Sequence, residues 1–483
     1  MNCNEMKIFN PSDSEHQAFL NSSFKHNLRE FISVEEIKRL TGGASRQMYL
    51  IKVQTRSGAS SFVLRLAAIS GDMASFDQLS LKNEVAVIKA VLKNDVLVPE
   101  VLFEFTDESG FGSGYVMEFI KGETLGGRIA KSKRFIEGRR VLNAQCAKML
   151  AKIHLIDIQK ADLARVLPKL EPKTLVDRMY QLYRFSGLHI PMLEFTYRWL
   201  HEHLPEKADQ VLTHGDFRNG NLLVDAHHGL QGILDWELAA ISDPMKDVAW
   251  ICLNPWRFGE SQLEVGGFGT LQEFLSIYQS EIGHPVNLHN FKFWTVYGSF
   301  WWCIVCILMG LSYRIHDSQR GDKVAIGRRY SESLIDLVNE LIPGPMQSSS
   351  FSTSVNADEV STLNELIASS LKDLTKDIVE ETHGKTKFAT RVVMSNLAVA
   401  LRELHQGPER DQFELRSAQR LLGRDFQNVQ ACRKELCAIL REQDWSMDKL
   451  ELEEHLRACI GRQIAIDQPN YSGYTTALSK SYN

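Results

Sequence analysis

The chain has 483 residues, of which 44% are hydrophobic and 24% are charged, and its formal net charge at pH 7 is −5. This composition is that of an ordinary globular protein, and the length exceeds a single hydrophobic core, so we expect about two or three domains and little disorder. The acidic balance, together with the absence of a nucleic-acid-binding motif, argues against nucleic acid as a partner.

No targeting signal is recognisable in the sequence. The N-terminal stretch MNCNEMKIFNPSDSEHQ is polar and lacks the apolar segment of a signal peptide. The eight cysteines are scattered without the paired spacing of a secreted disulfide framework. We therefore expect a cytoplasmic protein whose thiols are reduced.

A loop with two adjacent glycines, residues 41–47, precedes a strand-like segment at residues 48–53. Gly42 and Gly43 would allow the backbone to approach a phosphate group closely, and Ser45 belongs to the same loop. The alternative is an ordinary hairpin turn, which a Gly-Gly pair between strands often forms.

Short apolar segments continue through the first third of the chain. Residues 62–66 and 115–120 have the composition of strands, and residues 81–92 have the apolar spacing of a helix. Arg65 lies in the first of these strands and Glu84 lies on the helix. The simplest interpretation of Arg65 is a surface charge, although its neighbours on both sides are apolar.

The most informative stretch is residues 212–247, LTHGDFRNGNLLVDAHHGLQGILDWELAAISDPMKD. Phosphoryl transfer from ATP needs a group that holds the acceptor hydroxyl in line and a divalent metal that offsets the charge of the phosphate oxygens. Asp216 follows a short strand and is placed to take or orient the hydroxyl proton. Asn221 and Asp235 offer the hard oxygen ligands that suit Mg²⁺.

A predicted hairpin explains how the two metal ligands would meet. Residues 222–224 and 232–234 have the pattern of two strands that pair across a turn, which would bring Asp235 beside Asn221. Aspartate and asparagine are also common in ordinary turns. The order HGDxxxxN, LDWE and DPxxD favours the catalytic interpretation.

The elements HGDFR, LDWEL and WRFG (residues 256–259) resemble those of the aminoglycoside phosphotransferase-like family of small-molecule kinases. The resemblance is strongest to the kinase-like domains associated with some acyl-CoA dehydrogenases. It implies an α+β, protein-kinase-like two-lobed fold with a small β-rich N-lobe and a mainly helical C-lobe, here followed by a C-terminal α-helical bundle.

The same resemblance implies a role for each site residue. Asp216 would be the catalytic base, and Asn221 and Asp235 would bind the metal. Arg65 stands where kinases carry the phosphate-binding lysine, and Glu84 is the matching candidate for its ion-pair partner. A guanidinium can bridge phosphate oxygens and a carboxylate, so the arginine is compatible with the role.

Backbone groups near Glu118 and Phe119 would face the adenine in a kinase-like hinge, by resemblance only. The chain departs from protein kinases at Gly215, where a kinase catalytic loop has arginine. It departs again at Trp236 and Glu237, which replace the Phe-Gly after the metal-binding aspartate. We therefore expect no control by an activation-loop phosphate.

An aromatic and charged insertion separates the helix-like residues 142–156 from the catalytic loop. In the resembling family, helices at this place help to build the acceptor pocket. The residues concerned include Asp177, Tyr180, Tyr183, Arg184, Phe195, Tyr197 and Trp199. Arg257, in the WRFG element, is a candidate for holding an anionic substrate group, and an ion pair that packs the loop is an equal alternative.

Residues 293–311 carry no charge and are about long enough to cross a bilayer. There is no second such segment, and Gly298, Ser299 and Gly310 suit close packing inside a protein. We therefore expect a buried helix and no membrane span. The CIVC motif in this segment, Cys303 to Cys306, is interpreted as core cysteines.

A Pro-, Gly- and Ser-rich break, PGPMQSSSFSTS, marks the clearest linker. Beyond it, apolar residues at three-to-four spacing predict a small helical bundle and a polar tail from Gln468 that frays. The bundle suggests a docking, dimerising or regulatory module, through which the chain would form a homo-oligomer or bind a protein partner. The predicted divisions are an N-lobe (1–120), a C-lobe (121–345), a linker (346–354) and a helical accessory domain (355–483).

These observations predict an ATP- and Mg²⁺-dependent phosphotransferase that acts on a hydroxyl group of a small molecule. The resemblance points to a hydroxyacyl-CoA or hydroxy acid as acceptor, whereas the wider family also phosphorylates aminoglycosides, choline and sugars. The alternative from another class is a nucleotide-binding scaffold that has lost turnover.

Overall fold

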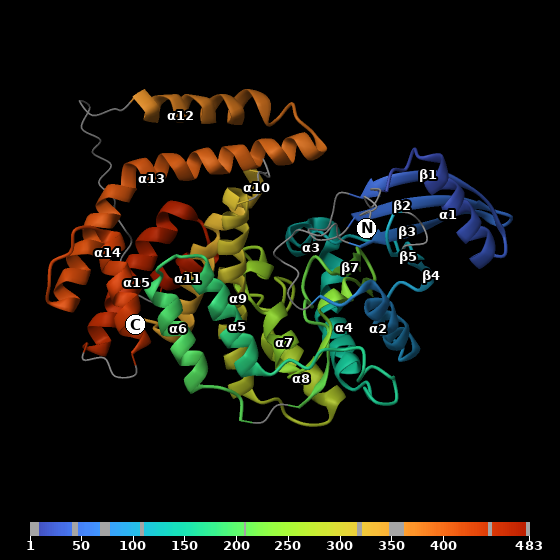
Figure 1. The fold of residues 1–483 in the computed structure, drawn as a ribbon, viewed down its shortest axis with the longest axis horizontal. Helices are drawn as coiled ribbons and strands as arrows, with labels where there is room; N and C mark the ends of the chain where they lie inside the picture. The colour runs from blue at the N-terminus through green and yellow to red at the C-terminus, as the bar shows by residue number, and fades with distance from the viewer. Residues whose placement is uncertain are drawn as a thin grey trace, which may run out of the picture. The chain divides into compact units, whose positions relative to one another are not determined.

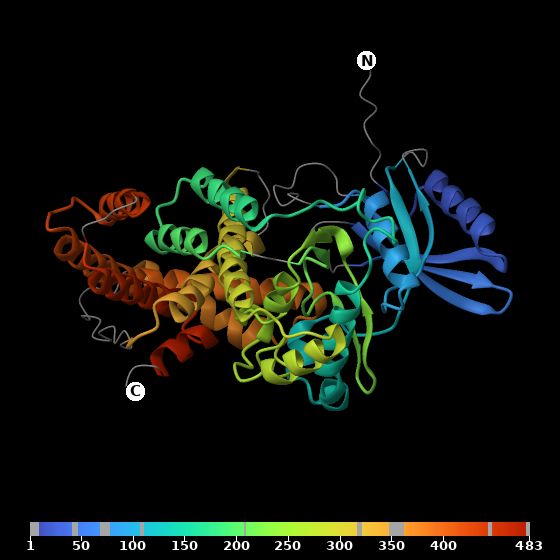
Figure 2. The same cartoon turned by 90° about the horizontal axis from the view of Figure 1, so that it is seen from below.

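The computed structural model describes residues 9–40, 47–67, 78–106, 111–206, 209–315, 321–346, 362–442 and 447–479. The chain forms two compact units, shown in two views in Figures 1 and 2. The first unit consists of Met1–Leu170 and Lys207–Phe291, and the second consists of Glu171–Glu206 and Lys292–Asn483. Each unit is thus built from two separate segments of the chain.

A five-stranded antiparallel sheet forms the N-terminal part of the first unit, with the strand order β1-β2-β3-β5-β4 (Figure 1). Its strands are β1 (Phe31–Leu40), β2 (Gln47–Thr55), β3 (Gly58–Leu66), β4 (Val101–Phe105) and β5 (Gly114–Glu118). The three strands expected at residues 48–53, 62–66 and 115–120 are therefore confirmed as β2, β3 and β5. The predicted phosphate loop, with Gly42, Gly43 and Ser45, lies outside the described residues.

Two helices, α1 (Ser14–Asn27) and α2 (Leu81–Lys93), accompany the sheet. Because side chains alternate along a strand, one face of β3 is apolar and packs with Phe24 of α1 in an aromatic core. Arg65 points from β3 toward the opposite face and meets α2, where Glu84 is buried. This alternation places a charged pair beneath the sheet.

The rest of the first unit combines short hairpins with helices that carry the catalytic stretch. The helices are α3 (Gly126–Lys131), α4 (Ile136–His154), α7 (Met245–Ile251) and α8 (Leu271–Ile282), with 3₁₀ turns η2 (Lys133–Phe135), η3 (Trp236–Leu238) and η4 (Asn254–Arg257). The strands are β6 (Val211–Thr213), β7 (Leu222–Asp225), β8 (Gly229–Ile233) and β9 (Ala240–Ser242). β7 pairs with β8 and Leu222 faces Ile233, which confirms the predicted hairpin.

The described part of the second unit is helical. It contains α5 (Pro172–Phe185), α6 (Pro191–Glu202), α9 (Leu288–Ile315), α10 (Gly321–Arg328), α11 (Tyr330–Leu341), α12 (Thr362–Asp373), the π-helical turn η6 (Leu374–Ile378), α13 (Gly384–Leu422), α14 (Val429–Arg441), α15 (Lys449–Asp467) and α16 (Ser472–Ser479). The β-rich N-terminal sheet and this helical remainder confirm the predicted α+β class.

Helices from both sides of the predicted linker pack together in the second unit. Arg441 of α14 donates through Nε to Glu194 of α6 at 3.1 Å, and Arg457 of α15 donates to the carbonyl of Ile342 at 3.1 Å. Apart from Met346, the predicted linker lies outside the described residues. The predicted division at residues 346–354 does not coincide with the compact units, because these contacts join helices across it.

The expectation of a frayed tail from Gln468 is wrong over residues 472–479, which form α16. Tyr474 and Ala477 of this helix are buried, and Tyr471 just before it donates to Asp336 of α11 at 2.6 Å. The tail looked polar because only a few of its residues are apolar, but these are the ones that pack.

The uncharged segment predicted at residues 293–311 belongs to α9. Among the described residues, α9 is the one helix that is long and apolar enough to cross a membrane, by length and composition only. Of its most apolar window, 61% is buried inside the protein, and Cys303 and Cys306 are both buried. A core helix passes the same test, so this burial favours the predicted buried helix.

Candidate active site

The loop that carries Asp216 begins where β6 ends. Gly215 has a φ of 84°, and a Cβ at this position would lie 2.2 Å from the carbonyl oxygen of Leu238. No other residue fits this backbone without displacing the neighbouring strand connection. The sequence departure at Gly215 therefore has a local cause, which is the close approach of residue 238.

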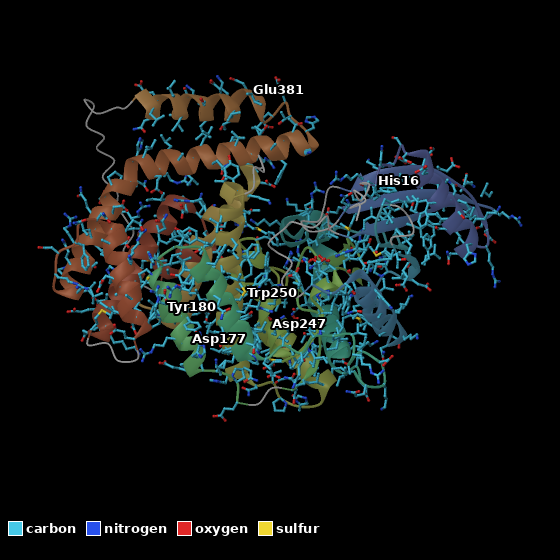
Figure 3. The ribbon with its side chains drawn as sticks, in the orientation of Figure 1. His16, Asp177, Tyr180, Asp247, Trp250 and Glu381 are labelled. Carbon is cyan, nitrogen blue, oxygen red and sulfur yellow. The ribbon has the colours of Figure 1, made fainter. Side chains whose placement is uncertain are left out.

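Three donors hold the carboxylate of Asp216. Oδ1 accepts from Nε1 of Trp250 at 2.6 Å and from Nε of Arg218 at 2.8 Å. Oδ2 accepts from Nδ2 of Asn221 at 2.7 Å. The side chain of Asp216 is only 15% exposed, so its position is set by these contacts. They come from the catalytic loop and from Trp250 of α7, which is labelled in Figure 3.

The backbone of this loop is held by Asp247 of α7, which is labelled in Figure 3. Its two carboxylate oxygens accept from the backbone N–H groups of His214 at 2.6 Å and Gly215 at 2.8 Å. Burial raises the pKa of Asp247, but the hydrogen bond from His154 and nearby positive charge bring that pKa below its usual value. Asp247 is therefore a charged anchor in a buried place.

His214 is neutral and lies between the loop of Asp216 and the loop of Asp235, as its hydrogen bonds require. Its Nδ1 accepts from the backbone N–H of Asp216 at 3.1 Å, so Nε2 must carry the proton that it donates to the carbonyl of Leu234 at 3.0 Å. Complete burial lowers the pKa of His214, which favours the same neutral form. The ring thus ties the loop of Asp216 to the residue that precedes Asp235.

The structure brings Asn221 and Asp235 together, as predicted. The backbone N–H of Leu234 donates to the carbonyl of Asn221 at 2.8 Å, directly after the last pair of the β7–β8 ladder. Asp235 has a left-handed backbone with φ 68° and ψ 64°. Non-glycine residues adopt this conformation at a cost, and such residues are concentrated at functional sites.

Arg65 is the centre of a cluster of three carboxylates. Its Nη2 lies 3.4 Å from Oε1 of Glu84 and 2.8 Å from Oε2 of Glu237, and it also donates to Asp235. Burial opposes the charge of Arg65, but Asp235 and Glu84 raise its pKa well above the ordinary value. Burial likewise raises the pKa of Asp235, and the charge of Arg65 more than offsets this, leaving that pKa low.

The expected hinge residues lie at the end of β5. The backbone N–H of Glu118 donates to the carbonyl oxygen of Glu100 at 2.9 Å. The backbone N–H of Phe119 donates to the carbonyl oxygen of Ser61 at 3.3 Å. Their carbonyl oxygens are therefore the backbone atoms of these two residues that an adenine could contact. Their role in nucleotide binding stays a prediction.

The sequence profile of the phosphotransferase enzyme family matches residues 36–279, which is half of the chain. The chain belongs to the phosphotransferase enzyme family. A second profile, that of a domain of unknown function named DUF6285, matches residues 380–471. The family match covers most of the sheet, the catalytic loop and α7, so the kinase-like fold described above is that of a member of this family.

Two relatives and one solved structure place this phosphotransferase among known proteins. It is 26% identical over 321 residues to acyl-CoA dehydrogenase family member 10 of Mus musculus, covering 62% of this chain and 29% of that protein. It is 27% identical over 173 residues to aminoglycoside 3'-phosphotransferase of Niallia circulans, covering 35% of this chain and 63% of that protein. A structure described as an aminoglycoside phosphotransferase from Ralstonia eutropha superposes with a TM-score of 0.53 at 20% identity, covering 66% of this chain and 94% of that one.

The site residues of this phosphotransferase fit a nucleotide and a divalent ion. Nε of Arg65 is buried and has no hydrogen-bond partner among the described residues, so a phosphate oxygen would satisfy it. Nδ2 of Asn221 points to Asp216, which leaves Oδ1 for an ion. No group of three or more His, Cys, Asp or Glu residues is arranged for a metal in the described part of the chain.

Arg257, the candidate substrate residue, donates through Nε and Nη2 to the carbonyl of Cys252 at 3.0 and 2.6 Å. It therefore caps the end of α7 and holds the turn that follows, which favours the structural alternative over an acceptor contact. Its role in substrate binding stays a prediction, and Nη1 is the guanidinium nitrogen that these two bonds do not use.

Replacing Arg257 by glutamine should lower the melting temperature without a selective rise in acceptor KM. The lost contact is a charge-assisted hydrogen bond to a carbonyl, typically about 1.5–3 kcal/mol. Thermal unfolding and steady-state kinetics of the same preparation separate the two roles. An unchanged melting temperature with a raised acceptor KM would restore the substrate interpretation.

Four residues that shape the site were not among the sequence candidates. Trp250 and Arg218 contact the carboxylate of Asp216, Glu237 contacts Arg65, and Asp247 holds the loop backbone. Arg218, Glu237 and Asp247 belong to the visible motifs HGDFR, LDWE and DPxxD, whereas Trp250 lies three residues beyond the last of them, and which atoms the four residues reach depends on the fold. Arg218 is further fixed by stacking over Trp256, with its guanidinium carbon 4.5 Å from the ring centroid.

Trp250→Phe removes the indole N–H and keeps an aromatic ring beside Trp256. We expect kcat to fall about 10- to 100-fold with little change in either KM, since one hydrogen bond to a charged group is worth about 1.5–3 kcal/mol. Trp301→Phe, the same change on α9 of the other unit, is the matched control. Equal kinetics for Trp250→Phe and wild type would show that Asp216 does not need this donor.

Asp247→Asn should destabilise the first unit by about 1–3 kcal/mol, because one buried backbone N–H loses its acceptor. Denaturant unfolding monitored by tryptophan fluorescence measures the change. Asp162→Asn removes a charge from an exposed position and serves as control. A stability loss equal to that of the control would mean that the amide still satisfies both N–H groups.

Proposed function

We propose that the protein transfers the γ-phosphoryl group of ATP to a hydroxyl group of a small molecule in a Mg²⁺-dependent reaction. The observation that carries the proposal is the convergence of Asp216, Asn221 and Asp235 within one compact unit, with Arg65 joined to Asp235. A positioned carboxylate, two hard oxygen ligands and a buried guanidinium are the parts that phosphoryl transfer requires.

Each residue has a distinct task in this proposal. Asp216 accepts the hydrogen bond of the acceptor hydroxyl and takes its proton as the new P–O bond forms. Trp250 and Arg218 hold Oδ1 of Asp216, so that the other oxygen faces a single direction. Arg65 supplies fixed positive charge for the phosphate oxygens. Mg²⁺, held by Asn221 and Asp235 when bound, offsets the charge on the phosphates.

A hydroxyacyl-CoA or hydroxy acid is the acceptor that we propose. The support is the similarity to acyl-CoA dehydrogenase family member 10, of whose length this chain spans 29%. The similarity to an aminoglycoside 3'-phosphotransferase favours the second candidate, an aminoglycoside, choline or sugar acceptor. An amine-bearing acceptor would need an acidic pocket, whereas a carboxylate or CoA acceptor needs positive charge.

The aromatic insertion residues such as Tyr180, labelled in Figure 3, belong to the other compact unit. Their part in an acceptor pocket stays a prediction.

The test is a panel of acceptors offered to the purified chain with ATP and Mg²⁺. Hydroxy acids and hydroxyacyl-CoA thioesters form one arm, and aminoglycosides, choline and sugars form the other. ADP release gives the rate, and mass spectrometry of the acceptor identifies a product heavier by one phosphoryl group. Asp216→Asn, prepared in parallel, shows which signal depends on the site.

The possible outcomes separate the alternatives. Phosphorylation of a hydroxy acid or its thioester supports the proposed acceptor. Preference for an aminoglycoside or another polyamine supports the second candidate. Nucleotide binding without any product from the whole panel would favour a scaffold that has lost turnover, against which the intact site residues argue.

A cytoplasmic location remains a prediction from the sequence.

A further inference from the structure

A cavity of about 590 Å³ lies on the helical second unit. It is lined by four side chains of α13, namely Phe413, Arg416, Gln419 and Arg420. Arg416 and Arg420 are one helical turn apart and therefore share a face. The volume lies within the range of about 300–1,000 Å³ that is usual for small-molecule sites.

A third arginine adjoins this cavity from the neighbouring helix. Arg462 of α15 stacks on the ring of Phe413, with its guanidinium carbon 3.5 Å from the ring centroid. The same two helices meet nearby, where His455 of α15 and Ser417 of α13 are hydrogen-bonded at 2.9 Å. The cavity thus lies beside a packed helix pair, and Arg462 contacts Phe413, one of the four residues that line it.

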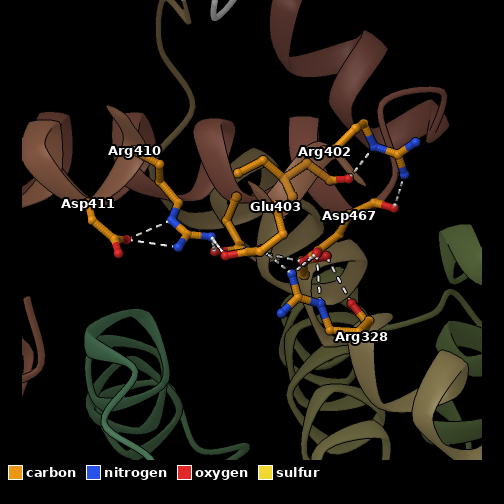
Figure 4. Close-up of polar contacts among 9 residues, drawn as sticks. Arg328, Arg402, Glu403, Arg410, Asp411 and Asp467 are labelled. Carbon is orange, nitrogen blue, oxygen red and sulfur yellow. Dashed lines mark hydrogen bonds and ion pairs between the residues drawn. The ribbon is translucent and has the colours of Figure 1, made fainter. Parts of the chain in front are cut away.

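None of these three arginines has an ion-pair or hydrogen-bond partner in the part of the chain that the structure describes. Other arginines of the same bundle do have partners, as Figure 4 shows for Arg410 and Arg328. Arg410 pairs with Glu403 and Asp411, both at 2.8 Å, and Arg328 donates through Nε to Asp467 at 2.9 Å. Arg328 and Arg410 therefore have carboxylate partners, whereas Arg416, Arg420 and Arg462 have none among the described residues, and Arg416 and Arg420 are exposed.

Leaving these charges unpaired has a cost that a ligand would remove. Two like charges at positions i and i+4 of one helix repel each other. Arg462 is partly buried, and burial lowers its pKa, with only weaker opposing influence from Cys459, Glu409 and Tyr474. An anion in the cavity would offset both effects. Guanidinium groups bind phosphate oxygens through paired hydrogen bonds, so a phosphate suits three of them better than an isolated carboxylate does.

We propose that the cavity lined by Phe413, Arg416, Gln419 and Arg420, with Arg462 beside it on Phe413, binds a phosphorylated small molecule of nucleotide size. The three guanidiniums hold its phosphates, and the amide of Gln419 can donate to and accept from a heterocyclic edge. Adenosine phosphate is a chemistry shared by ATP, ADP and coenzyme A, any of which could supply the ligand. The proposal concerns a second site on the helical unit and does not depend on the identity of the acceptor.

Hydrogen–deuterium exchange of the full chain is the test, because it locates binding along the sequence. ADP, coenzyme A and inorganic pyrophosphate are the probes, each added separately at low salt. We expect protection of peptides that cover residues 409–422 and 455–467, in addition to any protection of the catalytic stretch. Protection by all three probes assigns recognition to the phosphates, whereas protection by ADP alone or coenzyme A alone identifies the source.

The variant Arg416→Gln/Arg420→Gln should weaken binding at the second site on the order of 100-fold, since two charge-assisted contacts are lost. Arg391→Gln, which changes an exposed arginine on the same helix, is the matched control and should behave as wild type. Helical content and melting temperature verify that the double variant is folded. If no probe protects these peptides, or if protection is equal in the double variant and wild type, the proposal is overturned.

Discussion

Asp216→Asn lowers kcat by on the order of 10²-fold or more while nucleotide affinity stays close to that of wild type. The substitution removes the group that takes the acceptor proton but leaves Arg65, Asn221 and Asp235 in place. It keeps an oxygen that Trp250 and Arg218 can donate to, and Nδ2 of Asn221, which loses Oδ2 as an acceptor, keeps its bond to the backbone carbonyl of residue 216, so the loop keeps its structure. Single-turnover kinetics give the rate of the chemical step, and calorimetry with a non-hydrolysable nucleotide gives the affinity.

The control for this change is Asp225→Asn, because Asp225 ends β7 in the same hairpin and caps the turn that follows. It should retain nearly full turnover. Full activity of Asp216→Asn would refute the assignment of the base. A parallel loss of nucleotide affinity would instead mean that Asp216 helps to hold the metal.

Asp235→Ala is expected to remove most of the Mg²⁺-dependent part of nucleotide affinity, because one ligand of the ion is lost. Arg65 keeps two of its three carboxylates in this variant, those of Glu84 and Glu237, so the fold beneath the sheet should survive. The measurement is a nucleotide titration at several Mg²⁺ concentrations. We expect the curves of the variant to depend only weakly on Mg²⁺.

A steep Mg²⁺ dependence equal to that of wild type would contradict the metal role of Asp235. The informative comparison is Glu237→Gln, which removes a carboxylate charge from the same cluster without removing a predicted metal ligand. That variant should keep the Mg²⁺ dependence and lose affinity for the nucleotide itself, because Arg65 would be less firmly held.

Local sequence patterns were enough to predict the elements that carry the chemistry. The β7–β8 hairpin follows from two short apolar runs and a turn, and it brings Asn221 beside Asp235 because pairing of adjacent strands is a local event. The Arg65–Glu84 contact also followed, since a strand and the next helix leave few alternatives once the kinase-like resemblance is accepted.

Contacts between distant segments were not predictable in the same way. The aromatic residue Trp250 lies 34 positions after Asp216, and nothing in its neighbourhood indicates that its indole N–H would reach that carboxylate. Arg257 illustrates the opposite difficulty, because its two possible roles could not be separated by sequence. Its charge suggested a ligand, but a guanidinium also satisfies backbone carbonyls at a helix end, and here it caps α7.

Local sequence patterns also could not predict how the helices group into two units. Composition predicted a boundary in the Ser-rich stretch after Pro343, because periodic apolar residues are absent there. The packing of α6 with α14 depends instead on specific pairs such as Glu194 and Arg441, whose partners cannot be matched from a single sequence. Apolar periodicity tells which face of a helix is buried but not which helix will cover it.

The interleaved order of the two units affects how the chain folds during synthesis. Glu194 of α6 leaves the ribosome 247 residues before its partner Arg441 does. At a translation rate of about 5–20 residues per second, α5 and α6 wait on the order of 10 s or longer for α14. Meanwhile the sheet and the catalytic loop can close as soon as Phe291 has emerged, since their unit ends there. The nascent chain can therefore complete the unit that holds the catalytic loop well before α6 gains its contact with α14.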